Sequence, residues 1–222
     1  MTTIPALARS LRAIVPTALA AFALVALVAA PAQATKTKKV KVTGENTTLT
    51  LSKAAGDALA ANGIAVAPVD PATASPDGSL SFPITGGRVN PENLRGFIAH
   101  RGGIKLTRGD KTAVLRRFVI VNSKRGAYLD GLALVRKHVR GHGFRGAHHG
   151  NARVRFVQVY RAIRILKLGN VVRADADGKV VVTADGSVTK AAAKYLNRKL
   201  DVTLFTEGLA IGSAKVTATV AS

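Results

Sequence analysis

The chain has 222 residues, no cysteine, and 33 Lys and Arg against 12 Asp and Glu, which gives a formal net charge of +21 at pH 7. Without cysteine it forms no disulfide, carries no lipid on a thiol and performs no thiol catalysis. The positive charge favours an anionic partner, such as nucleic acid, anionic lipid, cell-wall polymer or a carboxylated small molecule, without choosing among them.

The first 34 residues have the pattern of a secretory signal peptide. Arg9 and Arg12 precede an apolar run at 14–30, and residues 31–34 (PAQA) supply a small-residue cleavage site. A retained membrane anchor is the alternative, but the run is short for a span and Pro16 interrupts it. We therefore expect an exported protein, secreted or associated with the cell surface, with no membrane span after cleavage.

The next segments begin a β-rich pattern that a short helix interrupts. A basic arm at 35–42 alternates into a strand. The stretch 51–63 predicts a helix, because Ser52 suits the N-cap position and Gly63 suits the position after the last turn. An apolar strand, IAVAPV at 64–69, and a proline-rich loop follow.

Beyond that loop, short strands alternate with glycine turns, which we expect at Gly102-Gly103 and Gly109-Asp110. The composition at 140–151 favours a loop, and 187–200 predicts a second helix before the closing strands. Many short strands with turns at near-regular spacing predict a mainly β fold, an antiparallel β-sandwich with two short α-helices. We expect one domain over residues 35–222.

The two expected helices resemble each other in sequence. SKAAGDAL at 52–59 and TKAAAKYL at 189–196 share the Lys-Ala-Ala start and the final Leu. Each leads into a stretch expected to be a strand, IAVAPV or VTLF. The likeness is either a coincidence among alanine-rich helices or the sign of two similar β-helix-β corners that bracket one sheet.

Several blocks resemble the HtaA-type domain of exported actinobacterial haem-uptake proteins. They are FPITGGRV (82–89), GFIAHRGGIKL (96–106), AVLRRFVIV (113–121), SVTKAAAKYLNRKL (187–200) and FTEGLAIGSAKV (205–216). The resemblance implies an antiparallel β-sandwich of immunoglobulin-like character that binds haem, with a tyrosinate as iron ligand and a histidine in support. His100 stands at the matching histidine. The region where the family's ligand tyrosine lies, 48–63, has no aromatic residue here.

For haem, His100 would either ligate the iron or hold a phenolate partner by a hydrogen bond. The alternative is a semi-exposed strand histidine without a ligand. Tyr128 and Tyr160 are the candidates for the phenolate. Tyr160 shares strand parity with apolar neighbours, so it is expected to pack inside the sandwich, and Tyr195 is expected to face the core from the second helix.

The stretch KHVRGHGFRGAHHGN, 137–151, holds four of the five histidines and no acid. Its glycines disfavour a helix that would align histidines, and its cations oppose a metal ion, so metal binding there is expected to be adventitious at most. The histidines in question are His138, His142, His148 and His149. The region is better suited to binding an anion. The candidate anion-binding residues are Arg136, Lys137, Arg140, Arg145, Arg153 and Arg155. The alternative is a solvated charged loop.

Catalytic signatures are absent: the sequence has no G-x-S-x-G, no H-E-x-x-H and no cysteine. Aromatic residues make up 5% of the chain and Trp is missing, which disfavours specific nucleic-acid binding because stacking surfaces are scarce. We expect an exported, non-enzymatic binding protein for haem or another anionic ligand. The alternative is a cationic surface or wall module that adheres to anionic polymers of the cell envelope without a small-molecule pocket.

Overall fold

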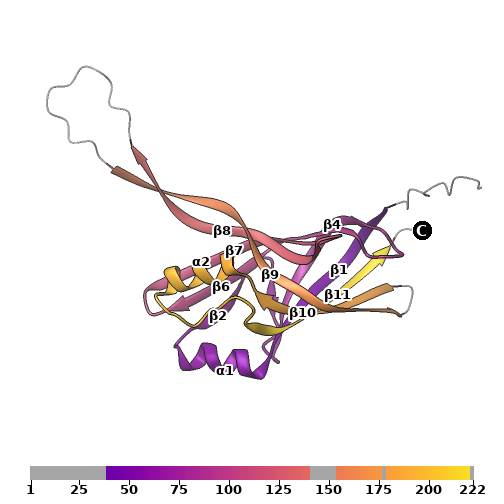
Figure 1. Cartoon of the computed structure of the whole chain (residues 1–222), viewed down its shortest axis with the longest axis horizontal. Coiled ribbons are helices and arrows are strands. Elements are labelled where there is room, and N and C mark those ends of the chain that lie inside the picture. The colour runs from indigo at the N-terminus through magenta and orange to yellow at the C-terminus, as the bar shows by residue number, and fades with distance from the viewer. Residues whose placement is uncertain (1–38, 141–153, 177–178, 221–222) are drawn as a thin grey trace, which may run out of the picture. The chain divides into compact units, whose positions relative to one another are not determined.

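The computed structural model describes residues 39–140, 154–176 and 179–220 (Figure 1). The expected signal peptide lies outside these residues. Within them, no helix is long and apolar enough to cross a membrane.

Eleven strands and two helices make up the described chain. In chain order they are β1 (Val40–Leu51), α1 (Lys53–Ala61), β2 (Ala65–Val69), β3 (Thr73–Ala74), β4 (Leu80–Val89), β5 (Gly96–His100), β6 (Gly103–Arg108), β7 (Lys111–Ser123), β8 (Gly126–Arg140), β9 (Val154–Ala176), β10 (Lys179–Val188), α2 (Lys190–Leu200) and β11 (Ala210–Val220).

The strands form one antiparallel sheet that closes on itself. Their order is β2-β6-β7-β5-β4-β1-β11-β10-β9-β8, and a further pairing of β8 with β7 closes an eight-stranded barrel. The expected mainly β, antiparallel class with two helices is confirmed. The immunoglobulin-like sandwich is not confirmed, because the β7–β8 pairing joins the strands into one ring rather than two packed sheets.

A bulge in β7 lets two strands share one of its edges. β6 pairs with residues 111–116 of β7 and β5 pairs with residues 119–122. Between them Arg117 adopts a positive φ of 52°, and its N–H donates to the carbonyl of Gly102 at 2.9 Å. Bulges of this kind re-aim side chains near a kink. Here the neighbouring end of β5 carries His100 into the barrel.

Both helices begin where the sequence predicts. The Ser52 and Thr189 hydroxyls each accept a hydrogen bond from the backbone N–H three residues later, at 3.2 Å. Gly63 follows α1 with a positive φ of 65°, as its place after the helix requires. The expected strand at VTLF is wrong, because residues 202–205 after α2 have no strand pairing.

Strands β8 and β9 continue together past their other neighbours (Figure 1). Along β8, pairing with β7 ends at Ala133, whereas pairing with β9 continues to Arg140. We call the described parts of this extension, residues 134–140 and 154–160, the β8–β9 ribbon. No third strand pairs with it in the described chain.

Candidate functional site

The barrel and the two helices enclose a cavity of about 170 Å³. Residues from most of the strands and from both helices line it, and all of them are Ala, Val, Leu, Ile or Phe except Thr47 and His100. Positions that match between the helices, Ala55 and Ala192, both contribute to its wall. The cavity is therefore an apolar site with one polar pair.

The exposed residues of the cavity lining come from α1 and from the segment 204–211. Of its lining residues, Ala54 of α1 and Ala210 are exposed, and Leu204 and Leu209 are half-buried. Ala55 is the one buried residue of α1. The alanine side chains of α1 therefore cover this part of the cavity.

His100 is buried, with 4% of its surface exposed, and both ring nitrogens are engaged. Nδ1 lies 3.1 Å from the carbonyl oxygen of Phe118, and Nε2 lies 2.7 Å from Oγ1 of Thr47. A carbonyl only accepts, so Nδ1 carries the proton and the Thr47 hydroxyl donates to Nε2. The Nε2 lone pair is therefore on the side of the ring that meets Thr47.

The imidazole is neutral at physiological pH. Burial lowers the pKa of His100 from 6.5 to about 4, and the hydrogen bond to the Phe118 carbonyl opposes that change only in part. Neutral imidazole with its second nitrogen fixed by a backbone carbonyl is the form in which histidine ligates metals. The expectation of a semi-exposed histidine without special surroundings does not describe this residue.

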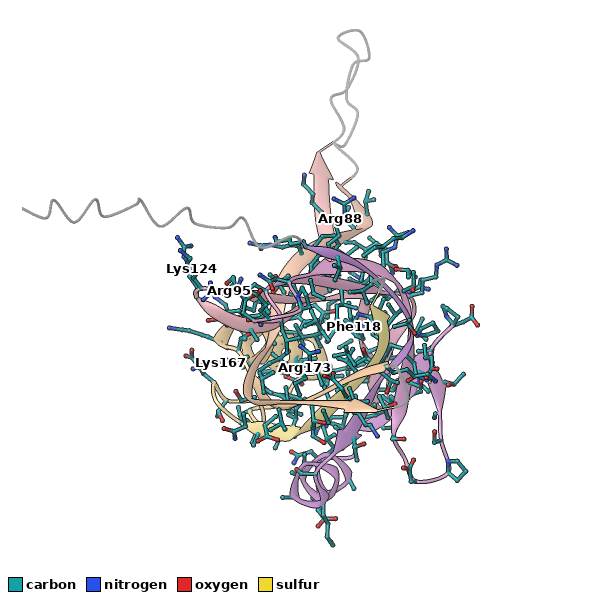
Figure 2. All side chains as sticks on the ribbon, turned by 90° about the vertical axis from the view of Figure 1, so that its right-hand side faces the viewer. Arg88, Arg95, Phe118, Lys124, Lys167 and Arg173 are labelled. Carbon is teal, nitrogen blue, oxygen red and sulfur yellow. The ribbon has the colours of Figure 1, made fainter. Side chains whose placement is uncertain are left out.

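Three neighbouring elements hold this pair in place. Thr47 comes from β1 and is buried, His100 ends β5, and Phe118 follows the β7 bulge. Phe118 lies inside the ring of strands, whereas Lys124 and Lys167 point outward from it (Figure 2). The ring of Phe118 also packs edge-on against Phe82, with centroids 5.0 Å apart. Sequence reasoning missed Thr47, because a threonine in a β-branched run carries no signal of a buried partner.

All three tyrosines of the chain are described, and none lines the cavity. Tyr195 faces the core as expected, and its hydroxyl contacts Val114 and Leu134 backbone groups at 3.0–3.3 Å. Tyr128 lies on the barrel wall, where the Arg164 guanidinium stacks 3.8 Å from its ring centroid. The expected packing of Tyr160 is wrong: it is 49% exposed on the ribbon.

The two candidate anion-binding residues whose side chains are described do not line the cavity that holds His100. Arg136 and Lys137 are exposed in the β8–β9 ribbon, and neither lines the cavity. Arg140, Arg155 and His138 belong to the same strands by backbone pairing. The remaining candidates, Arg145, Arg153, His142, His148 and His149, lie outside the described residues. In the described ranges no cluster of three His, Asp or Glu side chains is placed to hold a metal ion.

Neither a protein-family model nor a curated protein matches this sequence. Solved structures do match the fold. The C-terminal domain of HtaA from Corynebacterium glutamicum superposes with a TM-score of 0.54 at 12% identity, covering 81% of this chain and 99% of that domain. The N-terminal domain of the same HtaA gives 0.53 at 13% identity, covering 81% and 99%.

The heme binding protein HtaB from Corynebacterium glutamicum gives a TM-score of 0.52 at 12% identity, covering 83% of this chain and 96% of HtaB. Identities this low establish a shared fold and nothing about the residues of a site. The resemblance expected from the glycine and apolar blocks is confirmed at that level: the chain has the fold of HtaA-type domains.

Proposed function

We propose that this chain is a non-enzymatic haem-binding protein, with the apolar cavity as its site and His100 as the side chain that faces the iron. The observation that carries the proposal is the neutral, buried imidazole, whose Nδ1–H is held by the Phe118 carbonyl. The shared fold with a heme binding protein supports the same ligand. Haem, once bound, would supply the redox and ligand-binding chemistry of its iron.

The donor chemistry of the cavity fits haem, because imidazole is a common haem ligand and the apolar wall suits the macrocycle. Its volume does not hold the whole ring as the helices stand. A cavity of about 170 Å³ is close to the ~150 Å³ that holds benzene and below the roughly 300–1,000 Å³ of sites for larger ligands. Entry of the ring therefore requires the cavity wall to open, and α1 and the segment 204–211 supply the exposed part of that wall.

A haem titration followed by absorbance tests the proposal. The full chain should show a saturable Soret change at one haem per chain, and His100→Gln should weaken it and move the band. Gln is chosen because its amide can donate to the Phe118 carbonyl and accept from Thr47, which keeps the fold. An unaltered titration in a folded His100→Gln variant would remove His100 from the site.

The substitution Thr47→Val distinguishes a His100 that ligates the iron from a His100 that only stabilises the fold. The Thr47 hydroxyl donates a hydrogen bond to the Nε2 lone pair of His100. If Nε2 ligates the iron, removal of this hydroxyl leaves the lone pair available to the iron. A net hydrogen bond of about 1 kcal/mol corresponds to roughly fivefold tighter haem binding. A structural role for His100 predicts unchanged or weaker binding instead.

Filling the cavity supplies an independent test. Ala58 of α1 lines the cavity and Ala61 of the same helix is exposed and does not. Ala58→Leu should abolish haem binding while leaving the fold as stable or more so, because filling a void commonly adds about 0.5–2 kcal/mol. Ala61→Leu should bind haem as the unmodified chain does. Equal haem binding by both variants would place haem elsewhere.

We also propose that the protein is exported, on the strength of the leader pattern at residues 1–34. Expression in an actinobacterial host should yield an extracellular or surface form that begins at Thr35, as read by N-terminal sequencing. A cell-associated form that retains Met1 and the apolar run would contradict export by cleavage.

A further inference from the structure

The β8–β9 ribbon concentrates positive charge without carboxylates to neutralise it. From Gly131 to Ala174 the sequence has ten Lys and Arg and no Asp or Glu. The acids that flank this stretch are already engaged: Asp130 pairs with Arg164 at 3.1 Å and Asp175 pairs with Arg173 at 3.0 Å.

Three cations on or beside the described ribbon have no carboxylate within ion-pair distance in the described chain, namely Arg136, Lys137 and Arg161. All three are exposed. We call them the ribbon cations. Because they are exposed and have no carboxylate within ion-pair distance, they are available to an anion from solution.

The ribbon cations occupy both faces of the ribbon. Arg136 and Lys137 are consecutive in β8, so their side chains leave opposite faces of the strand. Arg161 pairs with Ala133 of β8, which shares strand parity with Lys137 and so lies on the Lys137 face. A planar anionic surface can meet only one face at a time. A flexible chain of anions can contact both.

The positive field extends to the end of α2. The pKa of Lys199 is lowered, first by burial and then by the nearby charges of Arg136 and Arg198. Cations in the last turn stabilise a helix by themselves, so Arg198 and Lys199 have that structural reason to be there. Arg136 adds a further positive charge near Lys199, so this end of α2 contributes to the same positive region.

Arginine dominates the stretch, with eight of the ten cations from residue 131 to 174. A guanidinium group binds two oxygens of one phosphate through parallel hydrogen bonds, which an ammonium group cannot do. The cavity beside His100 is not lined by any ribbon cation. We propose that the β8–β9 ribbon binds a flexible, linear phosphate polymer, separately from the cavity beside His100.

Long-chain inorganic polyphosphate is the probe, with affinity measured for the full chain across a series of NaCl concentrations. The test variant is the triple substitution Arg136→Gln, Lys137→Gln and Arg161→Gln. Its matched control carries Lys105→Gln, Lys190→Gln and Lys215→Gln, which remove the same charge from exposed positions off the ribbon.

Each cation that no longer neutralises a phosphate should lower the slope of log affinity against log salt by about 0.7–0.9. Removal of all three ribbon cations therefore lowers the slope by about 2–3 and the affinity by roughly 100-fold to 500-fold at about 0.1 M salt. The control variant should be weakened much less. Equal weakening of the two variants would overturn the proposal, since net charge alone would then explain the binding.

Two further binding measurements decide the class of partner. Binding to vesicles of anionic phospholipid at lower salt sensitivity than to polyphosphate would replace the polymer with a membrane surface. Tighter binding to a duplex DNA of equal charge would replace it with nucleic acid. Haem titration of the ribbon variant should match that of the unmodified chain, so failure of this proposal and failure of haem binding are separate results.

Discussion

Acidification should lower the free energy of unfolding through His100, because burial lowers the pKa of this residue. The pKa of the group is 6.5 in the unfolded chain and about 4 in the folded one. Between these values the unfolded state binds a proton that the folded state does not, so stability is fully present above pH 6.5 and falls as the pH drops. From about pH 7.5 to about pH 5 the loss is about 2 kcal/mol, and it approaches roughly 3 kcal/mol below pH 4.

Urea unfolding of the unmodified chain and of His100→Gln, at both pH values, measures this loss. Other titrating groups, including the four histidines at 138–149, are common to the two proteins. Their contributions cancel in the difference, which leaves His100. The unmodified chain should lose about 2 kcal/mol more than the variant between the two pH values. Equal losses would refute the buried, neutral imidazole and with it the basis of the haem site.

Two further predictions concern stability, each measured by urea unfolding at neutral pH. Tyr195→Phe should cost about 1–2 kcal/mol, because it removes the hydroxyl that bonds part-buried backbone groups of β7 and β8. Tyr160→Phe, on the exposed ribbon, should cost less than about 0.5 kcal/mol, and equal costs would contradict the assignment. Gly102→Ala should cost more than Gly109→Ala, although both have positive φ, because a methyl at Gly102 would meet the Ala72 nitrogen at 2.6 Å whereas Gly109 faces open space. The penalty at Gly109 should be roughly 1–2 kcal/mol, that of the left-handed conformation alone.

Local signals were enough to predict both helices. Ser52 and Thr189 are N-caps whose effect is confined to the first turn, and Gly63 serves the chain just after α1. The glycine turn at 109–110 was equally local, whereas the expected turn at Gly102-Gly103 is a connection in which Gly103 already begins β6. Each of these features depends on a few consecutive residues, so one stretch of sequence contains all the information that it needs.

Closure into a barrel could not be predicted in this way. It depends on β8 pairing with β7 around the bulge at Arg117 and on β1 pairing with β11 from the far end of the chain. Strand periodicity reports which face of a strand is apolar and does not identify its partner. A sandwich and a barrel built from the same strands therefore present the same sequence pattern.

The sequence indicated one of the two polar residues of the candidate site, His100, and not the other, Thr47. His100 stood out because it lies in the GFIAHRGG block that resembles the HtaA-type domain, whereas its partner Thr47 lies 53 residues away on another strand. The prediction for Tyr160 was wrong because the apolar neighbours that share its strand parity indicated packing, whereas its side chain is 49% exposed. Burial depends on what packs over a strand, which parity alone does not contain.

The arrangement of strands also bears on how copies of the chain avoid one another. Unpaired strand edges invite pairing between molecules and hence aggregation. Closure removes the edges of eight strands, and β2, which ends the sheet, carries Pro68 without an N–H to offer. Beyond the barrel, no third strand of the described chain pairs with either edge of the β8–β9 ribbon. Its like charges repel the same ribbon of a second molecule, so the cations that would attract a polymer also keep the protein from joining edge to edge.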